Sequence, residues 1–284
     1  MNKIGAFKKF CGKTTMKYGY YYDKEIELPF SEDKKRHVRV WLPPTYDFND
    51  DKKRFPVIYF ADGQNLVNKY LTAYGDWKAD KVVNSLIKRG IKGIIMVGID
   101  SPKKDIERSL ELNPPYEVRK IIKESWNNQD SYADKMIDFI VDKIKPLIDK
   151  NFFTMKDKEN TAIAGSSMGG IFSFYSLARH SDVFGFSLAF SPAFFLYKKS
   201  DWKNILDSFS MDMKTDNKIF LYVGGKGFEK KFVKSTFYTY EYLLKCKFDH
   251  DHLKMIFDSG EIHHEDAWNK YLKDALYFWL KDLN

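Results

Sequence analysis

The chain has 284 residues, of which 44% are hydrophobic and 17% are aromatic. A chain of this length and composition can bury a large core, and disordered chains are poor in aromatic residues, so a disordered protein is excluded. No segment approaches the about 20 consecutive apolar residues of a membrane-spanning helix. The first thirty residues contain no apolar run typical of a signal peptide. We therefore expect a single domain over residues 1–284, located in the cytoplasm, with no membrane partner.

The formal net charge is +8. A basic protein can bind nucleic acid, but here the lysines alternate with acids, as in Lys156-Asp157-Lys158-Glu159. We therefore expect a solvated lysine-rich surface, no nucleic-acid partner and a small-molecule substrate, and we leave a homodimer open. The two cysteines, Cys11 and Cys246, are expected to be free thiols, with one disulfide as the alternative.

Taken in chain order, the first clear strand pattern is at residues 36–42, where polar and apolar residues alternate. This alternation predicts a half-exposed antiparallel strand near a sheet edge. Later apolar runs do not alternate, which favours strands covered on both faces, as in a parallel sheet. These runs are residues 57–61, 93–98, 161–164, 186–190, 219–223 and 254–257.

Helical spacing of apolar residues predicts helices at residues 131–149 and 265–281. Pro146 is expected to kink the first of them near its end. Strands that alternate with helices after an antiparallel start predict a three-layer α/β domain with a mostly parallel sheet.

The most specific motif follows the strand at 161–164. Residues 165–169 read Gly-Ser-Ser-Met-Gly and match G-x-S-x-G with Ser167 at the centre. In this motif a strand turns sharply into a helix and exposes a nucleophilic serine at the tip of the turn. Residues 171–179 fit the helix, whose N-terminus favours developing negative charge. The alternative is a Gly/Ser turn without catalytic use, and the flanking strand and helix favour the nucleophile.

A catalytic triad with this serine motif has the chain order serine, acid, histidine. His263 and His264 follow the last predicted strand and precede the final helix, where a base could reach the serine. Glu229 is the first carboxylate after the strand at 219–223 and is our candidate for the acid that orients the imidazole. A surface glutamate among lysines is the alternative reading of Glu229. Asp258 and Glu261 are weaker options for the acid.

An oxyanion hole needs two backbone N–H groups. We assign them to Met168, which follows the nucleophile, and to Gln64, in the Asp62-Gly63-Gln64 turn after the strand at 57–61. Residues 249–252, Asp-His-Asp-His, look like a metal cluster but lie in a polar loop without cysteine or an HExxH pattern. We therefore expect no metal and no organic cofactor.

Several motifs in this order resemble the putative-esterase family of α/β-hydrolases. That family includes enterobactin-type siderophore esterases, feruloyl and acetyl-xylan esterases, S-formylglutathione hydrolases and the antigen 85 mycolyltransferases. The likeness covers roughly residues 35–282 and is greatest to the branch with DGQN and HxExxW blocks. The motifs are Asp62-Gly63-Gln64-Asn65-Leu66, Trp77, the segment 165–170, Phe190-Ser191-Pro192-Ala193-Phe194, and His263-His264-Glu265-Asp266-Ala267-Trp268.

The resemblance implies an α/β-hydrolase fold and a serine esterase in which His263, rather than His264, is the base. It supports the Gln64 N–H in the oxyanion hole, and it leads us to assign Asp62, Asn65 and Arg108 to substrate binding. Arg108 belongs to a block like the family's R..E..P, and a structural salt bridge is the alternative for it. The resemblance includes siderophore esterases that work with a serine–histidine dyad, so the identity of the acid stays open.

The resemblance leaves several functions open. The expected activity is hydrolysis of small-molecule esters through an acyl-enzyme, with siderophore-type, acyl and acyl-sugar esters as substrate classes. An acyltransferase of the antigen 85 type and a non-catalytic binding member are the alternatives. Residues 191–217 are rich in aromatic residues and fit either a cap over the acyl or aryl pocket or an ordinary crossover helix.

Overall fold

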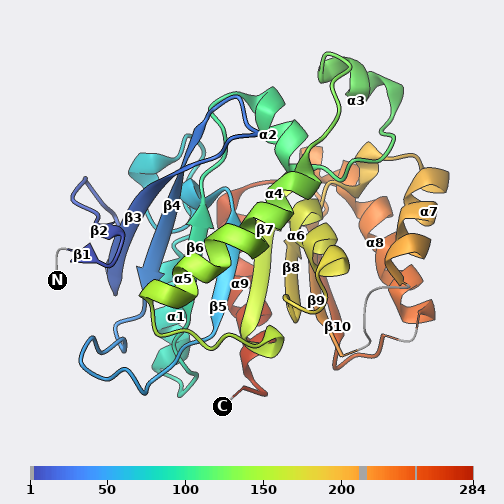
Figure 1. Cartoon of the computed structure of the whole chain (residues 1–284). Helices are drawn as coiled ribbons and strands as arrows, with labels where there is room; N and C mark the ends of the chain where they lie inside the picture. The colour runs from blue at the N-terminus through green and yellow to red at the C-terminus, as the bar shows by residue number, and fades with distance from the viewer. Residues whose placement is uncertain (1–2, 211–215, 247, 284) are drawn as a thin grey trace.

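The computed structural model describes residues 3–210, 216–246 and 248–283 (Figure 1). Its centre is a single mixed sheet. The strands are, in chain order, β1 (Lys3–Ile4), β2 (Phe7–Lys9), β3 (Tyr20–Glu27), β4 (Lys35–Leu42), β5 (Val57–Ala61), β6 (Ile95–Ile99), β7 (Thr161–Ser166), β8 (Phe186–Phe190), β9 (Lys218–Gly224) and β10 (Leu253–Asp258).

The strands lie in the order β1-β2-β3-β4-β6-β5-β7-β8-β9-β10. Strands β1 to β4 are antiparallel to their neighbours, and β4 pairs antiparallel with β6. From β6 to β10 every pairing is parallel. The predicted α/β fold with a mostly parallel sheet and antiparallel N-terminal strands is confirmed. All carboxyl ends of the parallel strands meet at one edge of the sheet, which is where open α/β sheets bind ligands.

Helices cover both faces of this sheet (Figure 1). They are α1 (Ala79–Ile87), α2 (Asp105–Leu112), α3 (Lys120–Ser125), α4 (Ala133–Phe139), α5 (Lys145–Asn151), α6 (Met168–Arg179), α7 (Lys199–Ser210), α8 (Lys230–Lys245) and α9 (Glu265–Leu280). The helix predicted at 131–149 is built from α4, a π-helical segment Ile140–Ile144 and α5. Pro146 is the second residue of α5, one residue after the π-helical segment.

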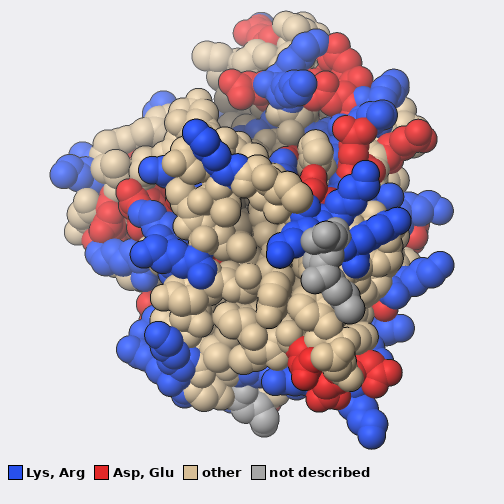
Figure 2. Space-filling view, turned by 90° about the vertical axis from the view of Figure 1, so that its left-hand side faces the viewer, with Lys and Arg blue, Asp and Glu red and all other residues tan. Residues whose placement is uncertain are grey.

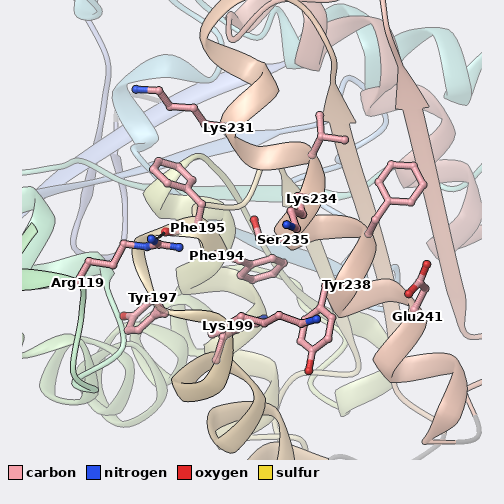
Figure 3. Close-up of a pocket in the computed structure, with 13 residues that line it drawn as sticks. Arg119, Phe194, Phe195, Tyr197, Lys199, Lys231, Lys234, Ser235, Tyr238 and Glu241 are labelled. Atoms are coloured by element: carbon pink, nitrogen blue, oxygen red, sulfur yellow. Dashed lines mark hydrogen bonds between the residues drawn. The ribbon is translucent and has the colours of Figure 1, made fainter.

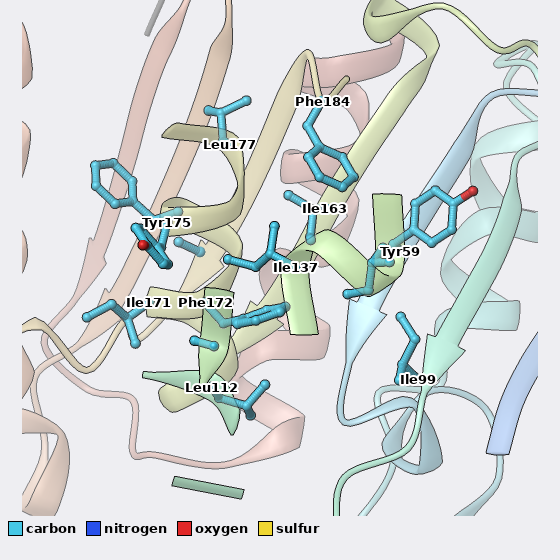
Figure 4. Packing of buried hydrophobic residues seen from close by; sticks show 14 of the residues in the cluster. Tyr59, Ile99, Leu112, Ile137, Ile163, Ile171, Phe172, Tyr175, Leu177 and Phe184 are labelled. Carbon is cyan, nitrogen blue, oxygen red and sulfur yellow. The ribbon is translucent and has the colours of Figure 1, made fainter. Parts of the chain in front are cut away.

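Successive residues of a buried strand face opposite layers, and β5 shows this directly. Val57 and Tyr59 pack in the cluster that contains α4 and α6, whereas Ile58 and Phe60 pack in the cluster that contains α1 and α9. Figure 4 shows part of the first cluster, in which side chains of α4 and α6 fill the space beside β7. Both faces of β5 are therefore apolar, which explains the absence of alternation in its sequence.

The N-terminal part of the sheet differs from its prediction. Strand β4 was expected to be half-exposed, and this is wrong: most of its residues are buried, including Arg36 and Arg39. Burial of these cations is compensated by ion pairs, because Arg36 lies 2.9 Å from a Glu111 carboxylate oxygen and Arg39 lies 2.6 Å from one of Asp100. Strands β1 to β3 were not predicted.

The surface agrees with the scattered charge of the sequence. Figure 2 shows basic side chains spread around the face on the β1 side, with acidic groups between them. Among the described residues, no helix is long and apolar enough to cross a membrane. Cys11 and Cys246 are free thiols.

Candidate active site

Ser167 occupies a sharp turn between β7 and α6. Its φ of 59° and ψ of −120° lie in a region that L residues rarely adopt. The turn is held by the Ser167 N–H, which donates to the Phe190 carbonyl on neighbouring β8 at 2.9 Å. A strained serine between a strand and a helix is the geometry of a nucleophile elbow.

The glycines around Ser167 are required by close packing. A Cβ on Gly165 would lie 2.4 Å from the Gly169 carbonyl oxygen, and a Cβ on Gly170 would lie 2.7 Å from that of Phe190. Both contacts are with backbone atoms, which cannot move aside cheaply. The motif spacing therefore reflects the crossing of β7 and α6.

His263 lies in the loop between β10 and α9, and its ring is held on several sides. Its Nδ1 is hydrogen-bonded to a carboxylate oxygen of Glu229. The ring stacks on Phe232 with centroids 4.5 Å apart, and Trp268 meets it edge-on at 5.0 Å. With Nδ1 occupied by the carboxylate, Nε2 is the nitrogen left for proton transfer.

Glu229 is fully buried at the end of the short 3₁₀ helix η6 (Gly227–Glu229), although the neighbouring Lys226, Lys230 and Lys231 are exposed. One carboxylate oxygen bonds His263. The other accepts the Gly224 N–H at 2.9 Å and the Ser191 hydroxyl. These three hydrogen bonds fix the direction of the buried carboxyl group. The alternative interpretation of Glu229 as a surface glutamate among lysines is therefore wrong.

Ser191 follows β8 and is a residue to which the sequence analysis gave no role. It is fully buried, with a φ of 44°, and its Oγ accepts the indole N–H of Trp268 at 2.9 Å while donating to Glu229. Its position could have been suspected because β8 neighbours β7, so residues after both strands reach the same edge of the sheet.

Ser167 and His263 line one cavity of about 500 Å³, which is within the range of small-molecule sites. Glu229 lies behind His263 and does not line it. The cavity also brings together the residues predicted to bind substrate. These are Asp62, Asn65 and Arg108. Gln64, which was assigned to the oxyanion hole, also lines the cavity.

The Gln64 backbone is fixed from two sides. Its side-chain amide bonds Ser101 twice: the Ser101 N–H donates to Oε1 at 3.0 Å, and Nε2 donates to the Ser101 hydroxyl at 2.7 Å. A Cβ on Gly63 would lie 2.3 Å from the Gly98 carbonyl carbon, so the turn presses against β6. Gln64 lies in the 3₁₀ helix η1 (Gly63–Asn65) and Met168 is the first residue of α6. N–H groups in a first helical turn have no partner within their helix, so they can bind an oxyanion.

Asp62 and Arg108 are paired with each other in the structure. Arg108 Nε lies 2.6 Å from one Asp62 oxygen and Nη2 lies 2.7 Å from the other. This bidentate ion pair compensates both charges, so the Arg108 guanidinium is not free to bind a substrate carboxylate. Asp105 and Glu265 add two further carboxyl groups to the wall, and burial raises the pKa of Glu265.

The other candidates for base and acid have different partners. His264 is the N-cap of α9, where its Nδ1 accepts the Asp266 N–H at 3.2 Å. Asp258 accepts the Tyr271 hydroxyl and lies 2.9 Å from Lys270 Nζ. Glu261 also lies 2.8 Å from Lys270.

Residues 191–217 contribute to a different cavity from the one that Ser167 lines. Phe194, Phe195 and Trp202 line a second cavity beside α8. None of the described residues of segment 191–217 lines the cavity that contains Ser167. The cap stays a prediction, and residues 211–215 of this segment lie outside the described part of the chain.

The family model described as Putative esterase matches residues 31–279. The chain belongs to this family. It is 21% identical over 265 residues to the uncharacterized protein YbbA of Bacillus subtilis, a match that covers 88% of this chain and 94% of that protein. Membership of the family makes the chain a carboxylic ester hydrolase that acts on small-molecule esters, and the resemblance noted from the motifs is confirmed.

Solved structures agree on the fold. An IroE-like serine hydrolase from Shewanella oneidensis has a TM-score of 0.72 at 18% identity, with 93% of this chain and 81% of that chain covered. The siderophore hydrolase EstA from Aspergillus nidulans has a TM-score of 0.66 at 18% identity, with 89% and 94% covered. At these identities the likeness shows the fold alone, which is the predicted three-layer α/β-hydrolase fold.

Proposed function

We propose that the chain hydrolyses esters through an acyl-enzyme on Ser167, with His263 as general base and Glu229 as the residue that orients it. The observation that supports this most is the bond between His263 Nδ1 and the buried carboxylate of Glu229, in a site where His263 and Ser167 line the same cavity. Serine, glutamate and histidine also follow one another in the chain order of this fold.

In this mechanism His263 Nε2 takes the proton of the Ser167 hydroxyl as Oγ attacks the ester carbonyl carbon. The carbonyl oxygen becomes an oxyanion, which the N–H groups of Gln64 and Met168 stabilise. His263 returns the proton to the leaving alkoxide oxygen, and the alcohol departs. A water molecule then attacks the acyl-enzyme, gives its proton to His263, and releases the acid and the free serine.

The cavity supports a small ester as the substrate. Its volume of about 500 Å³ fits an acyl or aryl group with a compact alcohol. Siderophore-type esters and acyl sugars are included, since a solved relative in fold is named a siderophore hydrolase and a curated relative, 29% identical over 159 residues, is named an endo-1,4-beta-xylanase/feruloyl esterase. The chain spans 19% of the latter protein's length.

The test is the reactivity of the two adjacent serines. Ser167→Ala should abolish hydrolysis of p-nitrophenyl acetate, whereas Ser166→Ala should retain most of it. A fluorophosphonate probe should label only Ser167 when the modified peptide is identified by mass spectrometry. Full activity in Ser167→Ala, or labelling of Ser166, would refute the proposal. Comparing kcat/KM over p-nitrophenyl acyl esters, feruloyl esters, acetyl sugars and enterobactin would then define the substrate class.

A further inference from the structure

A second cavity, separate from the one that Ser167 lines, lies between the segment after β8 and helix α8. Its volume is about 470 Å³, which is again the size of a small-molecule site. Phe195 in its wall meets Phe232 at 4.7 Å, and Phe232 stacks on His263. Aromatic rings therefore separate the two cavities.

Six of the described residues that line this second cavity are aromatic. Phe194 stacks on Trp202 with centroids 4.6 Å apart, and Tyr197 lies 5.6 Å from the same indole. Figure 3 shows Phe194, Phe195 and Tyr197 in the segment after β8, and Tyr238 on α8. Phe194, Tyr197 and Trp202 are buried and pack on one another, whereas Phe195 and Tyr238 are partly exposed. The partly exposed rings favour a flat aromatic ligand, because offset and edge-on ring contacts add to the burial of apolar surface.

The charged groups at the same cavity are mostly cations. Arg119, Lys199, Lys231 and Lys234 line it, and Glu241 is the single acid among its described lining residues. Arg119 uses Nε on the Phe195 carbonyl at 2.9 Å, and Lys199 Nζ lies 4.8 Å from the Tyr238 ring centroid (Figure 3). None of the four cations forms an ion pair with another described residue, so they are available to an anion.

We propose that this second cavity binds an aromatic monocarboxylate, with the ring among the aromatic side chains and the carboxylate at the cationic rim. The ring is held by stacking and burial, and the carboxylate by Lys199 and Lys234. The proposal does not depend on catalysis by Ser167.

Isothermal titration calorimetry with 2-naphthoate tests this site. The wild-type chain should bind one equivalent, and Lys199→Gln/Lys234→Gln should weaken binding by about fivefold to tenfold, because two exposed charge contacts are lost. The matched control is Lys198→Gln/Lys230→Gln, which removes two exposed lysines next to the cavity that do not line it. This control should bind like the wild type. Circular dichroism should show that both variants are folded.

Two further binding measurements test whether 2-naphthoate binds in the serine cavity instead, and whether it binds by hydrophobic contact alone. Lys103→Gln changes a cation in the serine cavity and should leave the affinity for 2-naphthoate unchanged. The uncharged 2-naphthamide should bind at least about fivefold more weakly than 2-naphthoate. The proposal is overturned by absence of saturable binding, by equal affinity for the amide, or by a loss of affinity in Lys103→Gln that Lys199→Gln/Lys234→Gln does not show.

Discussion

Trp268 reaches the carboxylate of Glu229 through a single hydroxyl, that of Ser191. The indole N–H lies 2.9 Å from the Ser191 oxygen, and that hydroxyl donates to the glutamate oxygen that does not touch His263. Because Trp268 also meets the His263 ring edge-on, one side chain supports both the proposed acid and the proposed base. We therefore expect Ser191 to be a positioning residue, which would act on the reaction through Glu229.

Ser191→Ala should lower kcat for p-nitrophenyl acetate by about tenfold with little change in KM, because the carboxylate loses one charged hydrogen bond while the substrate cavity is intact. Ser187→Ala is the matched control, since Ser187 is a fully buried serine on β8 whose hydroxyl contacts Ser173. Steady-state kinetics of both variants give the comparison. Equal kcat values in the two variants would show that Ser191 only fills space.

The two adjacent histidines should differ greatly. His263→Ala should lower kcat by about 10³-fold or more, as loss of a triad member does. His264→Ala should lower it by about tenfold or less, and should lower the free energy of unfolding by about 1 kcal/mol, because His264 caps α9. Kinetics and urea unfolding measure the two effects. A larger kinetic loss in His264→Ala would mean that His264 is the base.

Glu229→Gln should lower kcat by between about 10² and 10⁴, since the amide cannot stabilise the imidazolium and can leave His263 in the wrong tautomer. Asp258→Asn is the control for a nearby carboxylate that is bound to Lys270 and Tyr271. It should retain most of the activity. Wild-type turnover in Glu229→Gln would support a serine–histidine dyad, and a loss in Asp258→Asn alone would identify Asp258 as the acid.

Asp258 should contribute to stability in a pH-dependent way. The Tyr271 hydroxyl and then Lys270 lower the pKa of the Asp258 carboxyl to about 2. This pKa is lower in the folded state than in the unfolded state, where it is about 4. The stabilisation that Asp258 contributes is therefore complete at pH values well above 4 and is lost as the pH falls toward 2. The difference in free energy of unfolding between wild type and Asp258→Asn should thus be larger at pH 7 than at pH 3. Equal differences from urea titrations at the two pH values would contradict this assignment.

Gly165→Ala should both destabilise the protein and reduce activity. The added methyl group would lie 2.4 Å from the Gly169 carbonyl oxygen, and relieving that overlap should cost about 1–3 kcal/mol. Gly260→Ala is the control, because its methyl group would have an ordinary contact of 3.4 Å with the Asp258 side chain. Thermal unfolding and kinetics of both variants test the prediction. A stable and fully active Gly165→Ala would mean that β7 and α6 can separate at this turn.

Much of the fold could be predicted because the parallel strands are short apolar runs between helical segments. Strand β4 was misread because alternation of arginine with apolar residues normally indicates one exposed face. Here the partners of Arg36 and Arg39 are Glu111 and Asp100, which are distant in sequence, and no local pattern reveals them. Strands β1 and β2 are only two and three residues long, and in β3 three consecutive tyrosines precede a mostly charged stretch, so periodicity does not identify them.

The candidate site was predictable where its chemistry is local. The glycines around Ser167 encode the turn, and the position of His263 follows from the motif before α9. Glu229 was uncertain because the lysines beside it suggest a surface, and only the path of η6 turns the carboxylate inward. The role of Ser191 was invisible because it depends on contacts with Glu229 and Trp268, both far along the chain.

The edge of the sheet at which these residues meet has a consequence for cooperativity. Gln64 follows β5, Ser167 follows β7, Glu229 follows β9 and His263 follows β10, so the site draws on most of the length of the chain. No isolated supersecondary unit contains it. Fraying of a peripheral helix such as α3 leaves every part of the site in place, whereas separation of the parallel strands dismantles all of it together. Turnover therefore measures the integrity of the central sheet, and in a denaturant titration it should disappear in the same transition as the far-ultraviolet circular dichroism.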